Sequence, residues 1–443
     1  MRSPLVDGDP RLLAWRRVRE FAVPPSMIET ASARRVVGDW AGACAAARVD
    51  ADVDLRALAR SHGRELAARV RADLRHLAPD LLRWHMPRVA PDGLLRPGLT
   101  VPLARYRQAD GLVVVHLVAR TAPAWADAGQ RISLALWTGS PAGCGGHPHP
   151  HPDRRFRLDL HRHLWSARHA GELRERSGVE CRPGEAASHV GLVPEGCAVH
   201  RWTAEAALVR QSENRAGDPV IVRVGPRLRL ALDGDAVVPR ILPGQAPAYP
   251  VLPDAATWVL PDLELLRAGL IDAGRLHPLV AAALVPDYPA ADRSERPDHG
   301  GAARLVQCRG GQHRIALVAG VLATLDHDPE ELRREELLVS LGGTPLPCLR
   351  VIDEANRNPQ GLADIRARLD HGDTAGALSA VEDLLGPEAV LRDGALRDEL
   401  ETAAERRITY GLYRAGLAGR GPLKSPGVRR RIGRRHASRH ASR

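Results

Sequence analysis

The spacing of apolar residues changes along this chain, and this change limits the folds that it can adopt. Between residues 28 and 77, apolar side chains recur every three or four positions, as Leu66, Val70 and Leu74 do, which is typical of amphipathic helices. In 112–120, 131–137, 155–165 and the run that begins at 218, short apolar stretches are typical of β-strands. A Gly-Pro break at 225–226 divides the last run in two, as a hairpin would. From residue 251 onward, helical and strand-like stretches alternate. A chain of 443 residues can hold two or three domains of about 150 residues each, and we predict an α+β fold.

We divide the chain into five regions on this basis. They are a helical N-terminal region (1–105), a central β-rich region (106–250), an α/β module (251–355), a helical extension (356–420) and a basic tail (421–443). Within the module, Asp262 and Gly274 are the expected N-cap and C-cap residues of one helix. Strands are expected at 277–285 and at 346–353, and the capping pattern after Asp328 predicts a helix.

The positive charge of the chain is concentrated at its C-terminal end. The formal net charge is +10, and the last twenty residues carry eight cations and no acid. Lys424 is the only lysine, and an arginine-rich composition of this kind is typical of high-GC actinobacterial genomes. The rest of the chain is therefore close to neutral, so an electrostatic argument for nucleic acid applies to the tail. Its candidate contacts are Arg429, Arg430, Arg431, Arg434 and Arg435.

The cysteines and the hydropathy indicate a reducing compartment. Six cysteines are scattered without a CxxC pair, which argues against a disulfide framework. The N-terminal residues lack the apolar segment of a signal peptide, and no run of about 18 apolar residues occurs. We expect a cytoplasmic protein with no membrane partner.

One turn in the module has the composition of an anion site. The sequence around Gly310 and Gly311 is a short apolar run, two glycines, Gln312, His313 and Arg314, and then a helical apolar pattern. If this is a strand-to-helix corner, free backbone N–H groups at the positive end of the helix dipole favour an anion, and the Arg314 guanidinium suits a phosphate. The alternative is a purely structural turn with a hydrogen-bonded His313.

Three segments in order resemble the ParB/sulfiredoxin superfamily. They are LELLRAGLIDAGRLHPLV (263–280), LVQCRGGQHRIALVAG (305–320) and TPLPCLRVID (344–353), so the resemblance covers residues 251–353. It implies that Gly311 is the turn glycine and that Arg314 is the last arginine of the Gly-Glu-Arg-Arg pattern, which contacts a triphosphate. Gln312 stands where glutamate is usual and His313 where the first arginine is usual. Sulfiredoxins need cysteine at position 312, so sulfinic acid reduction is disfavoured.

The function expected from this resemblance is binding of a nucleotide or of nucleic-acid phosphate by a regulatory protein. The implied cofactor is a nucleoside triphosphate with Mg, and the catalytic residues are unknown. One alternative is a ParB-like nuclease or phosphotransferase, for which Asp262, Glu264 and Asp353 are the candidate carboxylates. The other is a non-catalytic scaffold or interaction protein that uses the helical N-terminal region.

Two further groups of histidine and cysteine are weaker candidates for a metal site. His147, His149 and His151 alternate with prolines, near Cys144, His161 and His163, and an extended His-Pro run points successive rings apart. Cys308 is expected to be a small buried residue of a strand. A second set has irregular spacing: Cys181, His189, Cys197 and His200. We therefore expect no metal site from the sequence.

The composition of residues 424–443 predicts a disordered basic tail that binds nucleic acid without sequence preference; the alternative is a tail that only aids solubility. Full-length protein should bind DNA with an affinity that falls steeply with salt, with a log–log slope of about −0.7 to −0.9 per phosphate neutralised. Deleting residues 424–443 should abolish this binding, because the deletion removes eight positive charges. A DNA titration of both proteins at two salt concentrations is the test. Equal affinities for the two proteins, or no binding by either, would exclude the tail as the contact.

Overall fold

The computed structural model confirms the α+β class and describes most of the chain. The residues described are 10–107, 114–126, 130–139, 147–179, 193–225, 228–234, 236–238, 249–287, 304–308, 310–318, 321–324, 326–341, 343–344, 346–350, 362–385 and 394–417. None of the helices within these ranges is both long enough and apolar enough to cross a membrane.

The N-terminal region is helical, as its apolar period predicts. Proline occupies the first helical position of α2 and α6, where its missing N–H costs nothing, and Asp39 and Asp54 cap α3 and α4 with their side chains. The elements are α1 (Pro10–Arg17), a π-helical turn η2 (Val18–Ala22), α2 (Pro25–Val36), α3 (Trp40–Ala46), α4 (Leu55–His62), α5 (Arg64–His76) and α6 (Pro79–His85).

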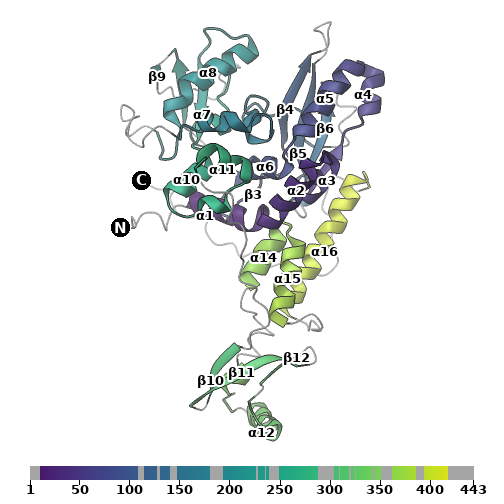
Figure 1. Cartoon of the computed structure of the whole chain (residues 1–443), viewed down its shortest axis with the longest axis vertical. Helices are drawn as coiled ribbons and strands as arrows, with labels where there is room; N and C mark the ends of the chain where they lie inside the picture. The colour runs from purple at the N-terminus through teal and green to yellow at the C-terminus, as the bar shows by residue number, and fades with distance from the viewer. Residues whose placement is uncertain are drawn as a thin grey trace, which may run out of the picture.

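A four-stranded sheet packs against these helices (Figure 1). Its strands are β1 (Val49–Asp52), β4 (Thr100–Arg107), β5 (Val114–Thr121) and β6 (Ile132–Trp137), in the order β1-β6-β5-β4. Strand β1 runs parallel to β6, and the other neighbours are antiparallel. The boundary expected at residue 105, between the helical and the β-rich region, lies inside β4. Residues of this strand share one apolar core with the N-terminal helices. Strands β2 (Arg88–Val89) and β3 (Leu94–Leu95) form a small hairpin beside it.

A second apolar core forms around α8 (Val199–Glu213). The Gly-Pro break predicted a hairpin, and β7 (Val220–Arg223) does pair antiparallel with β8 (Arg229–Asp233), followed by β9 (Ala236–Val238). The strand expected at 155–165 is wrong, because the backbone there closes tight turns such as Leu164 N–H to His161 O at 3.0 Å. The elements that follow are η6 (Arg162–Leu164), η7 (Ala170–Glu172) and α7 (Leu173–Ser177).

Residues 251–287 return to the first core as short helices. The strand expected at 277–285 is wrong, since Pro278 starts α11 (Pro278–Leu284) and the His277 ring accepts a hydrogen bond from Leu279 N at 3.1 Å. The expected caps also differ. Leu260 is the N-cap of α10 (Pro261–Arg267), and Gly269, with φ +66°, lies just past its end. The remaining elements are α9 (Asp254–Thr257) and η9 (Ala273–Arg275).

The last helices attach to the part of the structure described above, which together with them we call the body. A smaller unit projects beyond these helices (Figure 1). Helices α14 (Leu362–Asp370), α15 (Thr374–Leu385) and α16 (Ala395–Arg414) form a third apolar cluster. Helix α16 is tied to β1, because Tyr410 donates to Asp50 and Arg414 pairs with Asp52, each at 2.5 Å. We call residues 304–350, which follow α11 in the chain and precede α14, the arm.

A buried ion pair joins the two ends of the first core. The carboxylate of Asp262 in α10 accepts from Arg19 and from the indole N–H of Trp84, both at 2.6 Å, and it is fully buried. The Arg19 guanidinium also lies 3.8 Å from the centroid of the Trp84 ring. A second buried pair, His277 with Asp80 at 2.8 Å, links α11 to α6. Removing one member of such a pair would leave the charge of the other member buried in the core without a counter-ion.

Asp262→Ala should therefore destabilise the body by about 3–5 kcal/mol, because Arg19 would be left buried without its counter-ion. Asp92→Ala is the matched control: it removes the partner of Arg17, whose side chain is 48% exposed, and should cost about 1 kcal/mol or less. Urea unfolding followed by tryptophan fluorescence measures both changes. Similar losses in the two variants would contradict the structural role of Asp262.

Candidate metal centre

The expected strand-to-helix corner is wrong, because the chain turns back as a hairpin. Strands β10 (Arg304–Cys308), β11 (Gly311–Val318) and β12 (Val321–Thr324) form an antiparallel sheet in which Cys308 pairs with Gly311 across the turn. Gly310 lies in this turn with φ +82°, which glycine adopts without strain. The extended β11 offers no helix N-terminus, so the dipole argument for an anion does not hold here.

The other predicted ligands of the phosphate are distributed along β11. Gln312 is exposed and pairs with Gln307 in the sheet register. Arg314 already has a counter-ion, since its guanidinium lies 2.8 Å from Asp326 and its backbone N–H donates to the same carboxylate at 2.7 Å. A phosphate at Arg314 would therefore compete with Asp326. His313 instead stacks on His327, with ring centroids 4.1 Å apart and planes 9° apart.

Three metal-ligating side chains meet beside this sheet. One ligand atom each from Cys308, His327 and Cys348 lies within 4.8 Å of the other two. Cys308 ends β10, His327 follows β12, and Cys348 lies in the helical segment 347–350. The strand expected at 346–353 is thus wrong where the structure describes it. Cys308 and Cys348 lie forty positions apart in sequence and come together because residues 346–350 pack against the end of β10.

The distances and the chemistry of these donors suit zinc. A tetrahedral zinc ion with thiolate and imidazole ligands holds its donor atoms roughly 3.3–3.8 Å apart, so small side-chain shifts would close the cluster around the ion. Cys308 and Cys348 are 1% and 0% exposed, and the His327 side chain is 4% exposed. In the thiol form, burial and the adjoining Cys308 together raise the pKa of Cys348 to about 12. Thiolates paired with imidazole select zinc over oxygen-preferring cations such as Mg²⁺.

His327 has the orientation that a metal ligand needs. The Nε2 atom of His327 is buried and has no hydrogen-bond partner among the described residues, which is costly unless something binds it. Its Nδ1 lies 3.8 Å from a carboxylate oxygen of Glu331. Histidine ligands commonly use one ring nitrogen for the metal and direct the other toward a carboxylate. The Nδ1 atom of His313 is likewise buried without a partner in the described structure, but its ring is stacked nearly parallel on that of His327 and would have to rotate to bind the same ion.

Sequence reasoning missed this cluster because no short spacing marks it. Cys308 is expected to be a small buried residue of one strand, Cys348 falls within another expected strand, and His327 lies in an Asp-His-Asp turn that looks only like the start of α12 (Pro329–Ser340). Among the described side chains of the arm, the buried apolar cluster consists of Cys308, Leu346 and Cys348, packed against Val306 and Leu349.

The His-Pro tract makes ordinary structural contacts. His147 is buried and its Nε2 lies 3.0 Å from the carbonyl of Thr121, while its Nδ1 accepts from His149 N at 3.2 Å. His151 packs edge-on against Trp137. Cys144, Cys181 and His189 lie outside the described residues. Cys197 and His200 lie at the start of α8, where burial raises the pKa of Cys197 to about 12.

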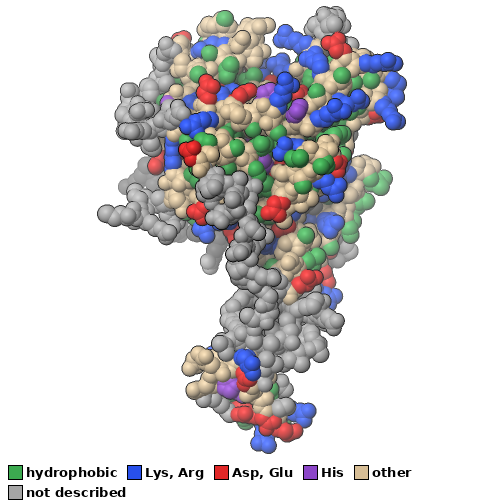
Figure 2. All heavy atoms as spheres, viewed as in Figure 1, with side chains coloured by type: hydrophobic (Ala, Val, Ile, Leu, Met, Phe, Trp, Pro, Cys, Tyr) green, Lys and Arg blue, Asp and Glu red, His purple; other side chains and the backbone are tan. Residues whose placement is uncertain are grey.

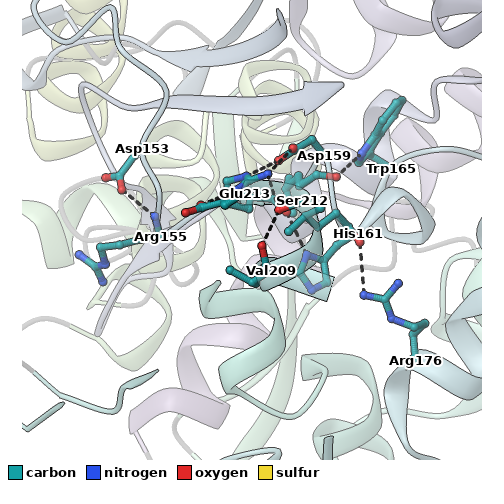
Figure 3. A network of polar contacts seen from close by, with 12 residues as sticks. Asp153, Arg155, Asp159, His161, Trp165, Arg176, Val209, Ser212 and Glu213 are labelled. Carbon is teal, nitrogen blue, oxygen red and sulfur yellow. Dashed lines mark hydrogen bonds and ion pairs between the residues drawn. The ribbon is translucent and has the colours of Figure 1, made fainter. Parts of the chain in front are cut away.

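Figure 3 shows the polar network that fixes residues 153–165 against α8. Arg157 pairs with Asp159 at 2.8 Å and with Glu213 at 3.0 Å, and the hydroxyl of Ser212 donates to the carbonyl of Val209. His161 lies 3.1 Å from the buried carboxylate of Glu205.

The same Glu205 carboxylate also binds two arginines. They are Arg176, at 2.8 Å, and Arg201. Burial opposes the charge, but bonds from His161 and these arginines lower the pKa of Glu205 to about 2. The carboxylate therefore stays ionised, and the cluster holds α7 to α8.

The carboxylates proposed for catalysis are not at the turn. Asp262 is bound in the core of the body, and Glu264 pairs with Arg11 at 2.5 Å. Asp353 lies outside the described residues, as do the tail residues Arg429, Arg430, Arg431, Arg434 and Arg435. Neither Asp262 nor Glu264 therefore supports catalysis at β11.

The elements that carry the ParB resemblance also differ from those expected. Residues 278–284 are helical, 311–318 form a strand, and 347–350 are helical. Comparison with protein-family models, with curated proteins and with solved structures found no match to this chain.

Proposed function

We propose that this chain is a zinc-binding protein in which one ion folds the arm into an interaction module. The observation that carries the proposal is the meeting of Cys308, Cys348 and the buried, unpartnered Nε2 of His327 within 4.8 Å. Rotation of the His313 ring out of its stack on His327 would complete a Cys2His2 set. Zinc thiolates would also fit the reducing, cytoplasmic environment that the scattered cysteines favour.

The burial of the donors favours a structural ion over a catalytic one. Catalytic zinc keeps an open position for water or substrate, whereas structural zinc is closed by four protein ligands. Here both cysteines are almost fully buried, and the ring of His313 covers that of His327. An ion bound by these donors would contribute folding free energy to the arm directly.

Helix α12 gives the arm a surface suited to a protein partner. Its first turns mix acids with arginines, as in the Arg333–Glu330 pair at 3.2 Å, which gives no consistent positive face for a phosphate backbone. Its C-terminal end exposes Leu337, Leu338 and Leu341, whose side chains would be buried at an interface. The arm extends away from the body, which leaves this helix accessible (Figure 1).

Purified full-length protein should hold about one zinc ion per chain after gel filtration, measured by plasma mass spectrometry. Cys308→Ser, Cys348→Ser and His327→Ala should each lose most of that zinc, because each removes a donor. Gln312→Ala is the matched control in β11, since its exposed side chain lies outside the cluster and zinc should remain.

A second control separates the cluster from cysteine content in general. Cys197→Ser removes a half-buried thiol from the body and should leave the zinc content unchanged. If the full-length chain holds no zinc, or if Cys197→Ser loses as much as Cys348→Ser, the arm is not the zinc site. In that event Arg314→Ala, tested against nucleoside triphosphates with Mg, examines the nucleotide-binding alternative.

Nucleic-acid binding is a second candidate function, and a feature of the body adds to the argument from the tail. Arginine side chains gather over α4 and α5, at the upper right of Figure 2. The exposed members are Arg56, Arg60, Arg64, Arg69, Arg71 and Arg75. Salt-sensitive DNA binding that survives deletion of 424–443 would assign the contact to this face of the body.

A further inference from the structure

A cavity in the body, remote from the arm, has the features of a small-molecule site. Its volume is about 270 Å³, close to the lower end of the range usual for ligand pockets. It lies where α1 and α10, which are adjacent in Figure 1, meet the β2–β3 hairpin and residues 156–164. These segments come from four parts of the sequence, so the cavity is a product of the fold and not of one loop.

Most of the cavity wall is apolar and aromatic. Trp15 and Trp258 are half-buried, and Phe156 is buried. The Arg11 guanidinium lies 5.4 Å from the centroid of the Trp258 ring and pairs with Glu264, which leaves the ring fixed in position. Aromatic faces of this kind favour a flat, apolar ligand group.

The charged groups on the wall favour an anion. Arg96 lines the cavity, its buried Nε has no partner, and its guanidinium forms no hydrogen bond within the described residues. Arg88 donates to the carbonyl oxygens of Gly93 and Arg83 and meets no carboxylate in these bonds. Among the described residues, the one acid that lines the cavity, Asp254, pairs with Arg155 at 3.1 Å and also interacts electrostatically with Arg96. Because Arg88 and Arg96 share the wall with this single carboxylate, the wall keeps a net positive charge.

Two acceptors on the wall have no donor. Asp254 keeps one buried oxygen, Oδ1, unpartnered among the described residues. His85 has a side chain only 3% exposed, and its Nδ1 lies 3.1 and 3.0 Å from two carbonyl oxygens, so Nδ1 carries the proton. Burial lowers the pKa of His85 to about 4, which keeps the ring neutral at pH 7. Its Nε2 therefore carries a lone pair without a hydrogen-bond donor among the described residues, and it lies 3.7 Å from the carboxylate of Asp262.

We infer that this cavity binds a small aromatic acid that also carries a hydrogen-bond donor. The carboxylate lies at Arg96, the ring lies among Trp15, Phe156 and Trp258, and the donor reaches Asp254 or His85. A guanidinium that donates hydrogen bonds to a carboxylate in a partly buried site contributes more affinity than a fully solvated one. The inference is independent of zinc, because the arm supplies none of these residues.

Three probes that share one ring separate the parts of this site. Calorimetric titration of the full-length protein should show saturable binding of 4-hydroxyphenylacetate. Phenylacetate, which lacks the donor, should bind about two- to tenfold more weakly. Tyramine keeps the ring and the hydroxyl but replaces the acid by an amine, and it should not bind.

Variants of the body identify the anion contact. Arg96→Gln should weaken both acids about ten- to a hundredfold, because it removes a charge-assisted bond. Arg96→Lys keeps the charge but not the planar fork, and should bind with intermediate affinity. Arg17→Gln is the control. Arg17 is exposed at the end of α1, and although other residues of α1 line the cavity, Arg17 does not.

Thermal melts of each variant verify that the body is folded. No saturable binding of either acid, tyramine binding equal to that of the acids, or equal affinity in Arg96→Gln and Arg17→Gln would overturn the inference.

Discussion

The main constraint on the fold of the arm is that two buried thiols and a buried imidazole lie close together. Cys308, Cys348 and His327 stand within 4.8 Å of one another, and the imidazole Nε2 has no partner in the described structure. Burying such a group without a bond costs free energy. A bound zinc ion would remove that cost and would add metal–ligand bonds that stabilise the hairpin.

The body is stabilised in a different way. Its first core extends from the N-terminal helices through the four-stranded sheet to α11, so apolar burial supplies most of its stability. Buried pairs such as Arg19 with Asp262 then fix which segments meet. Helix α16 ties the C-terminal helices to β1. This division favours separate roles, with a small-molecule cavity in the body and a zinc-dependent binding surface on the arm.

The sequence predicted the parts of this fold that depend on local period. Helices between 25 and 76, strands β5 and β6 and the β7–β8 hairpin follow from apolar spacing and turn residues. The failures fall where tertiary contacts override composition. The Ala-rich run 278–284 looked like a buried strand but is capped as a helix by His277, and Gly310 serves a hairpin instead of a helix corner. The metal cluster combines residues up to forty positions apart, so its existence depends on a strand pairing that no local pattern encodes.

The most direct test of the account is X-ray absorption at the zinc edge of the purified full-length chain. Bonded distances identify the ligands, because sulfur lies about 2.3 Å from zinc and imidazole nitrogen about 2.0–2.1 Å. The account predicts two sulfur and two imidazole neighbours, from Cys308, Cys348, His313 and His327. A shell of oxygen or nitrogen without sulfur would contradict it, since the ion would then be bound elsewhere on the protein.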